Sequence, residues 1–329
     1  MDSLTQLVLG ASVAGACVPK GQRRKALLAG AVLGTLPDLD VLIDYGDAVK
    51  NFTYHRGFSH SLLVLAPFAV LLWLALRRWW APVRAAPNRW LAAIVLTLVT
   101  HPLLDAHTAY GTQLLWPLES PPVMWSTLFI IDPLYTLPLV IGALLAAIRP
   151  AGRSAVIALC AGLFLSTAYL GWSWFGKSLV EQDARQVLTD LGIPDAPVFS
   201  TPTPFNTVLW RVVALTDSGY LQGYDSLLVD TRPIRFDAYP SDTVSLQAAS
   251  NIWSVGRLRW FASDFIKASV ENEQLLLTDL RMGGEPNYVF THAVAERSNP
   301  GWRPIATEQI FGTFSRGDLD MIRRRLWHD

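Results

Sequence analysis

The chain has 329 residues and no formal net charge, and it is unusually apolar, with 51% hydrophobic and only 16% charged residues. Proteins that bind nucleic acid usually have a basic surface, so the neutral charge balance argues against a nucleic-acid partner. The excess of apolar residues indicates that part of the chain lies in a lipid bilayer. Residues 1–176 contain 20 of the 54 charged side chains, and residues 177–329 contain the other 34. The sequence therefore predicts a membrane part followed by a soluble part.

Apolar segments follow one another through the membrane part. Pro37, Pro67 and Pro138 interrupt three of them, and several are shorter than the roughly 20 residues that span a bilayer. Such segments are tolerated at membrane depth where they pack against protein. We expect a multi-pass α-helical membrane domain over residues 1–176, with about five or six helices, some of them short or kinked. The segments are residues 4–18, 26–43, 61–76, 90–106, 127–148 and 154–175.

The loops between these segments alternate in charge. Residues 19–25, 77–89 and 149–153 hold ten of the twelve basic residues of this part, whereas its eight acidic residues and four histidines lie at the opposite ends. Basic loops face the cytoplasm. For a bacterial inner membrane, the pattern predicts that the acidic face, the N-terminus and the C-terminal soluble part lie on the periplasmic or outer side.

The first polar motif on that face is "PDLD", in which Asp38 and Asp40 follow the proline that ends an apolar segment. In an extended turn, the two carboxylates could bind one metal ion or bridge two. Alternatively, one of them caps a following helix, which is a common role for aspartate. The motif alone leaves both interpretations open.

The second motif is "HRGFSHS", which places His55 and His60 directly before a long apolar segment. Gly57 permits a tight backbone, and Ser59 or Ser61 could cap the next helix. A lone histidine is more often an ordinary polar contact than a ligand. Neither histidine therefore identifies a site by itself.

The third motif, "HPLLD", contains His101 and Asp105 at the end of an apolar segment. The two residues are four apart, so on a helix they share one face. Ionisable groups in such a position are costly and indicate a function or a pairing, and imidazole and carboxylate are good ligands for zinc or a similar divalent ion. A hydrogen bond between the two that pins the helix is the alternative.

Together the three motifs predict a metal site, because the expected topology brings them to one membrane face. Six candidate ligands are enough for one or two divalent ions, with zinc as the expected ion. Two ions can together activate water and stabilise the leaving oxygen of a phosphoester. The predicted ligands are Asp38, Asp40, His55, His60, His101 and Asp105.

Other polar residues on the same face are secondary candidates. Asp132 could cap the helix that follows it or accept a proton, and Asp40 is the other candidate proton acceptor. Arg56 could bind an anionic substrate or meet lipid headgroups. His107 follows Asp105 by two residues and would face away from it on a helix, which favours a structural role.

The second part of the chain reads as soluble. Residues 177–200 are expected to form a helix that leaves the membrane and then a proline-rich linker. Residues 201–329 are expected to form a small α+β domain with an antiparallel sheet. No catalytic motif occurs in it, and the isolated His292 and His328 are expected to be exposed or hydrogen-bonded.

Local patterns indicate the elements of this domain. The hairpin signal "DSG" joins two runs that are rich in Val, Leu and aromatic residues, and two further alternating runs follow. The strand-like runs are residues 207–216, 219–230, 273–284 and 287–296, and residues 241–270 look largely helical.

The motifs resemble those of one family. "MDSLTQ", "LPDLD", "HRGFSHS" and "HPLLDAHTAYGTQLLWP" are similar to stretches of the YdjM-like inner-membrane proteins, which are described as metal-dependent hydrolases, and "FIIDPLYTLPL", "TPTPFNTVLWRVV" and "DLRMG" resemble the longer members with a C-terminal soluble domain. The resemblance implies a multi-pass bacterial membrane protein. Many relatives have histidine where this chain has Gln6, so one ligand or a second metal ion is in question. The ligands that the resemblance implies are His55, His60, His101, Asp105 and the aspartates of "PDLD".

The helix with His101 and Asp105 is more distantly similar to that of zinc-dependent phospholipase C and the related single-strand nucleases, which implies phosphoester hydrolysis by analogy. We therefore expect a membrane-bound metal-dependent hydrolase that acts on an ester or phosphoester, including lipid-linked ones, in contact with the lipid bilayer. One alternative is a non-catalytic anchor that holds a structural metal and binds a partner. Another is an ion- or proton-coupled transporter, which would place polar residues at the midplane rather than at one face.

Overall fold

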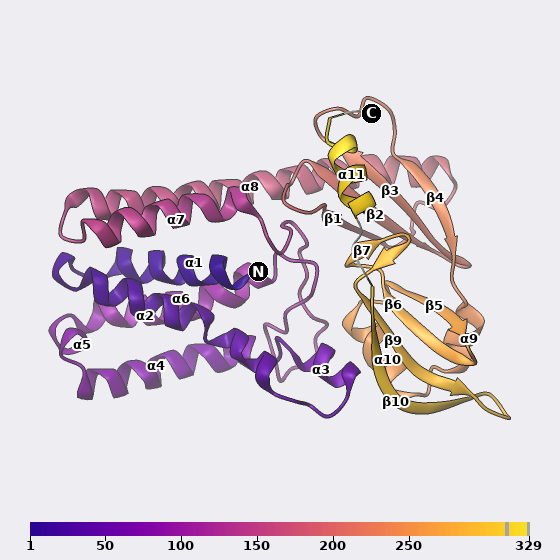
Figure 1. The fold of residues 1–329 in the computed structure, drawn as a ribbon, viewed down its shortest axis with the longest axis horizontal. Coiled ribbons are helices and arrows are strands. Elements are labelled where there is room, and N and C mark those ends of the chain that lie inside the picture. Colours follow the sequence, from indigo (N-terminus) through magenta and orange to yellow (C-terminus); the bar gives the residue numbers. More distant parts are fainter. Residues whose placement is uncertain (313–315, 328–329) are drawn as a thin grey trace. The chain divides into compact units, whose positions relative to one another are not determined.

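The structure is a computed structural model that describes residues 1–312 and 316–327, so the isolated His328 lies outside the described residues. The chain divides into two compact units (Figure 1). The first, called here the helical unit, comprises Met1–Ile43 and Arg56–Ser173, and the second, called here the sheet unit, comprises Asp44–His55 and Trp174–Asp329. The chain therefore leaves the helical unit at Asp44, contributes the short segment Asp44–His55 to the sheet unit, and returns to the helical unit at Arg56.

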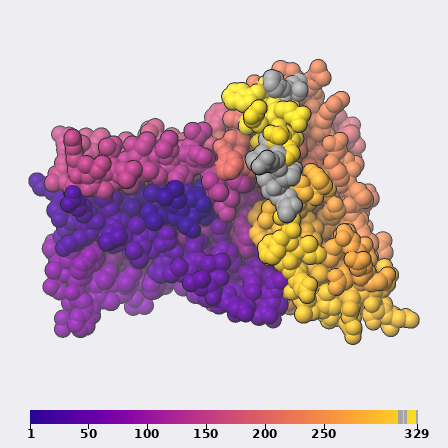
Figure 2. All heavy atoms as spheres, in the orientation of Figure 1, coloured from indigo at the N-terminus to yellow at the C-terminus, as the bar shows by residue number. Residues whose placement is uncertain are grey.

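Helices form the helical unit. Helix α1 contacts α2, α6 and α7, and α4 contacts α6. With all heavy atoms drawn, the indigo N-terminal residues lie between the magenta residues of α7 and α8 and the purple residues of α4 and α5 (Figure 2). The helices are α1 (Ser3–Cys17), α2 (Arg23–Thr35), α4 (Leu62–Trp79), α5 (Ala81–Ala85), α6 (Pro87–Asp105), α7 (Pro133–Ile148) and α8 (Arg153–Asp190), with 3₁₀ turns η1 (Lys20–Gln22), η2 (Pro37–Leu42) and η3 (Phe58–His60).

Two helices among the described residues are long and apolar enough to cross a membrane by length and composition, namely α4 and α8. Helices α1 and α7 are apolar but shorter. Helix α8 has 38 residues and runs without a break from the helical unit into the sheet unit. At about 1.5 Å per residue it is about 57 Å long.

Glycines bring α1 and α2 into close contact. A Cβ atom added at Gly10 would lie 2.2 Å from the carbonyl oxygen of Gly30, and one added at Gly34 would lie 2.5 Å from the carbonyl oxygen of Gln6. Any larger residue at these positions would force the two helices apart. The contact fixes the C-terminal end of α2 against the start of α1.

The sheet unit contains two four-stranded antiparallel sheets, which confirms the predicted α+β domain with an antiparallel sheet. One sheet has the strand order β1-β2-β3-β4 and the other β10-β9-β6-β5, and a two-stranded ribbon pairs β7 with β8. The strands are β1 (Val198–Pro202), β2 (Leu209–Thr216), β3 (Gly219–Ser226), β4 (Arg235–Pro240), β5 (Ile266–Glu271), β6 (Gln274–Asp279), β7 (Gly283–Gly284), β8 (Asn287–Tyr288), β9 (Phe290–Arg297) and β10 (Trp302–Phe311). The helices of this unit are α3 (Ala48–Tyr54), α9 (Thr243–Ala248), α10 (Trp253–Phe261) and α11 (Arg316–Arg325).

Two segments differ from the sequence-based expectation. Residues 241–270 were expected to be largely helical, but Ile266–Glu271 forms β5, because Asn272 and Glu273 both have positive φ angles and close a tight hairpin to β6. Strand β1 lies in the proline-rich stretch for which the sequence predicts a linker, and it pairs there with β2. In both cases, pairing with a neighbouring strand decides the local structure.

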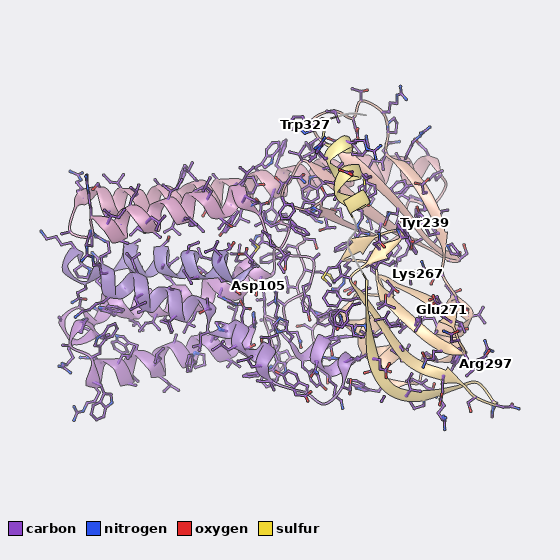
Figure 3. The ribbon with its side chains drawn as sticks, viewed as in Figure 1. Asp105, Tyr239, Lys267, Glu271, Arg297 and Trp327 are labelled. Atoms are coloured by element: carbon purple, nitrogen blue, oxygen red, sulfur yellow. The ribbon has the colours of Figure 1, made fainter. Side chains whose placement is uncertain are left out.

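Charged and polar side chains link the two sheets. The Arg211 side chain on β2 donates hydrogen bonds to the carbonyl oxygens of Leu280, at 2.7 Å, and Arg281, at 3.0 Å. Lys267, on β5 and visible in Figure 3, lies 2.7 Å from the carboxylate of Glu285, which also contacts the Tyr220 hydroxyl of β3. These partners satisfy the buried guanidinium of Arg211, so the network stabilises the contact between the sheets.

Candidate metal centre

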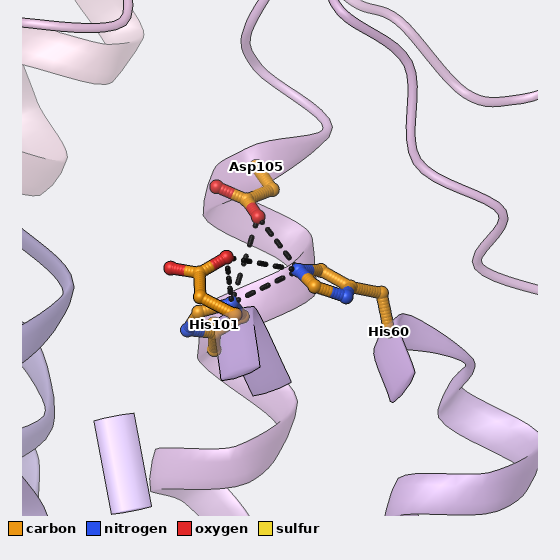
Figure 4. A group of neighbouring side chains, drawn as sticks. His60, His101 and Asp105 are labelled. Carbon is orange, nitrogen blue, oxygen red and sulfur yellow. Dashed lines mark hydrogen bonds and ion pairs between the residues drawn. The ribbon is translucent and has the colours of Figure 1, made fainter. Parts of the chain in front are cut away.

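Four of the predicted ligands come together in the helical unit. One ligand atom from each of Asp38, His60, His101 and Asp105 lies within 4.8 Å of all the others. Asp38 is on η2, His60 ends η3, and His101 and Asp105 occupy the last turns of α6 (Figures 3 and 4). Three of these side chains are buried, and Asp38 is 20% exposed.

The ligand atoms are spaced as a small cation requires. His60 Nε2 lies 3.1 Å from His101 Nε2, 3.0 Å from Asp105 Oδ2 and 3.4 Å from Asp38 Oδ1, and His101 Nε2 lies 3.4 Å from Asp38 Oδ1. In a tetrahedral zinc shell with bonds of about 2.0–2.1 Å, the ligand atoms are about 3.3–3.4 Å apart. Two imidazole nitrogens and two carboxylate oxygens with this spacing could hold a metal ion.

A backbone carbonyl sets the tautomer of His101. Its Nδ1 lies 2.6 Å from the carbonyl oxygen of Gly34, which can only accept, so the ring proton is on Nδ1. Gly34 lies in the last turn of α2, where carbonyl groups have no partner within the helix. The Nε2 atom of His101 therefore presents a lone pair to the cluster.

A hydroxyl and a carboxylate set the tautomer of His60. Ser59 Oγ donates a hydrogen bond of 2.6 Å to Asp40 Oδ2 and lies 2.9 Å from His60 Nδ1. Because the single hydroxyl proton is directed to Asp40, Ser59 accepts the proton of Nδ1. The Nε2 atom of His60 then also presents a lone pair, and partners that orient a ligand in this way are typical of metal sites.

The electrostatic surroundings favour a positive charge at this point. Two lone pairs that face each other at 3.1 Å repel unless a cation or a proton lies between them. The C-terminal ends of α2 and α6, which carry partial negative charge, both reach the cluster. Burial alone would lower the pKa of His60, but the carboxylates of Asp105 and Asp38 outweigh it and raise the pKa.

The second oxygen of Asp105 has partners of its own. Oδ1 accepts a hydrogen bond of 2.9 Å from Gln6 Nε2 and contacts the amino group of Met1. Gln6 Nε2 also donates to the carbonyl oxygen of His101 at 3.1 Å, and two acceptors on one atom identify it as the nitrogen of the amide. Gln6 therefore orients Asp105 from the side that faces away from His60.

Arg56 is buried in the site. Its Nε lies 3.3 Å from Asp105 Oδ2, and its backbone N–H donates to Asp40 Oδ2 at 2.9 Å. The guanidinium also donates to Thr108 Oγ1 at 3.1 Å and lies over the ring of Tyr110. Its φ angle of 57° is in the left-handed region, and Gly57 has an unusual ψ angle of −111°, so the tight backbone expected at Gly57 extends over both residues.

The other predicted site residues lie outside the group of four. Asp40 contacts Ser59, one hydrogen bond away from His60, and His55 caps the C-terminal end of α3. Asp132 caps α7 by accepting from the N–H groups of Leu134 and Tyr135, and it accepts from the Tyr169 hydroxyl at 3.0 Å. A further histidine, at position 107, lies edge-on to the ring of Trp125.

Sequence reasoning pointed to Gln6 but did not assign Ser59 and Gly34 as residues that orient the histidine ligands. The sequence suggests Ser59 or Ser61 as a helix cap, and Ser61 takes that role by accepting from the N–H of Leu63. A serine directly before a candidate histidine ligand is a weak signal that could have suggested the contact. The hydrogen bond between His101 and Gly34 has no sequence signal, because its acceptor is a backbone carbonyl group, which every residue has.

The fold and the site together define a protein with a helical unit and a sheet unit, in which the helical unit contains a His₂Asp₂ group that could hold a metal ion. The family model of the YdjM inner membrane proteins matches residues 1–180, so the chain belongs to the YdjM inner membrane protein family and lies in a membrane. The match covers the helical unit and all four clustered residues.

Among curated proteins, the chain is 38% identical over 96 residues to "Inner membrane protein YbcI" of Escherichia coli (strain K12). This match spans 28% of the chain and about half of the relative, 54% of its length. No solved structure matches the chain.

Proposed function

We propose that this protein is a membrane-bound metal-dependent hydrolase that acts on an ester or phosphoester. One observation carries the proposal: two imidazole nitrogens, each with its proton held on the far side of the ring, converge with two carboxylate oxygens in a buried site. Membership of an inner membrane protein family supports contact between the site and the lipid bilayer. A site in contact with the bilayer could reach a substrate that is linked to a lipid.

The proposed centre holds a single ion, and zinc is the proposed ion. The four ligand atoms all lie within 4.8 Å of one another, and a second ion about 3.5–4 Å away would need ligands of its own. Asp40 and His55, which could have supplied them, lie outside the group. A mixed nitrogen and oxygen donor set at tetrahedral spacing is typical of zinc.

In the proposed mechanism, a divalent ion would supply a Lewis acid that lowers the pKa of a bound water to about 7. The side chains of His60, His101, Asp38 and Asp105 would hold the ion. Between the two candidate proton acceptors, Asp40 is the better supported, because Ser59 connects it to His60. The bonds that Asp132 accepts at the start of α7 support its alternative role as a helix cap.

The proposed location is the outer face of the inner membrane, with several passes and with the sheet unit outside the cytoplasm. The gathering of basic residues in the loops at 19–25, 77–89 and 149–153, away from the metal ligands, supports this orientation. The sheet unit would then be free to bind substrate or a partner.

A structural ion is the second candidate, and one observation favours it. Four protein ligands would be enough to fill a four-coordinate shell, as in structural zinc sites, whereas catalytic sites keep a position open. Asp38, the most exposed of the four, is the ligand that could move to admit water. In the structural case the protein would be a non-catalytic anchor.

Metal analysis of the purified full-length protein is the first test. We expect one divalent ion per chain, and a metal-free protein with an unchanged fold would rule out the centre. Phosphodiester and lipid-ester substrates, tested with and without a chelator, then separate the two candidates. Chelator-sensitive hydrolysis supports the enzyme, and a tightly bound ion without turnover on any of them supports the anchor.

A further inference from the structure

The segment that connects two ligands of the metal centre is built into the sheet unit. Asp38 and Asp40 precede the segment Asp44–His55, and His60 follows it, yet the segment itself packs as part of the sheet unit. Its only helix among the described residues is α3, at Ala48–Tyr54. Helix α3 packs against α10 and β10, and its aromatic side chain at position 52 also reaches β9.

Aromatic packing holds the centre of α3. The ring of Phe52 lies 5.0 Å from that of Phe261 on α10, 4.7 Å from that of Phe290 and 5.1 Å from that of His292, both on β9. Phe52 is buried by these contacts. The helix therefore contributes to the core of the sheet unit.

Polar contacts hold both ends of α3. At the C-terminal end, Arg257 donates to the hydroxyl of Thr53 at 3.0 Å and to its carbonyl oxygen at 3.1 Å. At the N-terminal end, Thr307 of β10 donates to Asp47 at 3.0 Å and accepts from the N–H of Val49 at 3.1 Å. These side chains come from positions more than 200 residues away in the sequence.

A helix of seven residues does not persist alone in water, because helices below about 12–15 residues are marginal. The conformation of α3 is therefore maintained by the sheet unit. Thr53, which Arg257 holds, lies three residues before Arg56, and the N–H of Arg56 binds Asp40 while its side chain lies beside Asp105. The chain thus connects the anchor directly to groups that surround the ligands.

We propose that the sheet unit regulates the metal centre by holding α3, which fixes both ends of the ligand-bearing segment. The inference rests on the metal centre proposed above. With α3 held, only residues 41–47 and 55–59 remain to be ordered between Asp40 and His60 when an ion binds, so less chain entropy is lost. By linkage, a bound ion must stabilise the docking of α3 by the same factor.

The test measures zinc affinity in the full-length protein in detergent, by competition with a chromophoric chelator. Arg257→Met removes the anchor at Thr53, and Thr307→Val removes one hydroxyl at the other end with little change of shape. We expect each to weaken zinc binding about tenfold, within the usual range of coupling between sites. Arg325→Met is the matched control, because it breaks an ion pair of 2.7 Å with Asp230 elsewhere in the same unit and is expected to leave the affinity unchanged.

The reciprocal measurement is amide hydrogen exchange in α3. We expect zinc to slow exchange there about tenfold in the wild type and to have no effect in His101→Ala. If Arg257→Met and Thr307→Val fold and bind zinc like the wild type, or if Arg325→Met weakens binding equally, the coupling is refuted while the metal centre stands. A wild type that binds no zinc overturns the centre itself.

Discussion

The Nε2 atoms of His60 and His101 face each other at 3.1 Å, and each ring has its proton engaged on the opposite nitrogen. This arrangement is unfavourable for two neutral rings, and a shared cation resolves it. We expect His101→Ala to weaken zinc binding by more than about a hundredfold, which exceeds the usual effect of losing an orienting partner. Calorimetric titration of the purified protein measures this change.

His107→Ala provides the matched control for that experiment. His107 is on the same stretch of chain, but its Nδ1 bonds the carbonyl oxygen of Leu103 and its ring meets Trp125. Its removal should leave zinc affinity unchanged. Equal losses in the two variants would contradict the assignment of His101 as a ligand.

The contact between Ser59 and His60 leads to a second prediction. Ser59→Ala removes the hydroxyl that bridges Asp40 and His60, and we expect zinc affinity to fall about 10–100-fold although no ligand is lost. Ser59→Thr keeps the hydroxyl and should restore most of the affinity. Unchanged binding by Ser59→Ala would show that His60 is oriented by other contacts.

Zinc binding should depend on pH through His60. The carboxylates of Asp105 and Asp38 raise the pKa of His60 against the opposing effect of burial, so a proton occupies the ion-free site at higher pH than on a free imidazole. Zinc must displace that proton. Affinity should therefore be constant above the raised pKa and fall about tenfold per pH unit below it, and a series of titrations from pH 8 to pH 5 tests this expectation. A flat profile would indicate that His60 does not titrate.

The sheet unit should be sensitive to acid because of His292. Burial lowers the pKa of His292 to about 4, below the usual value of about 6.5. Between these values the unfolded chain binds a proton that the folded chain does not, so stability is complete above about pH 6.5 and falls by roughly 3 kcal/mol as the pH drops to 4. Thermal unfolding of the full-length protein across this range measures the effect.

His292→Gln is the comparison that isolates this effect. Asp225 acts in the opposite sense, because burial raises its pKa to about 6 and protonation of the folded state then stabilises it in acid. Both proteins contain Asp225, so it cancels in the difference between them. Identical pH profiles for the two proteins would mean that His292 does not contribute.

A reporter fused after Asp329 tests the orientation of the sheet unit. We expect a reporter that folds only outside the cytoplasm to be active when it is fused at this position. The reason is that, in the expected topology, the basic loops and the soluble part lie on opposite sides of the membrane. Activity of a cytoplasm-only reporter at the same position would reverse the assignment.

Part of the metal centre could be predicted from residue spacing. His101 and Asp105 are four apart on a helix, and helical periodicity alone places them on one face. The sequence could not tell which of Asp38 and Asp40 is a ligand, because residues two apart in an extended turn point to the same side. In the 3₁₀ helix that forms here, with about three residues per turn, the two side chains point in different directions.

The position of His55 could not be predicted, for a different reason. It follows α3, and the contacts that hold α3 join residues such as Thr53 and Arg257, which are 204 positions apart. No local pattern reports such a pairing. The same limit applies to β5, whose hairpin with β6 prevails over a local sequence that suggested a helix.

The glycines between α1 and α2 have a consequence for the chemistry of a ligand. Gly34 can bring its carbonyl oxygen to His101 only while α2 stays close to the backbone of Gln6, and a single methyl group at position 34 would prevent this approach. Without that acceptor, the imidazole could move its proton to the nitrogen that faces the cluster. The basicity of a metal ligand in α6 is thus set by the absence of a side chain in α2.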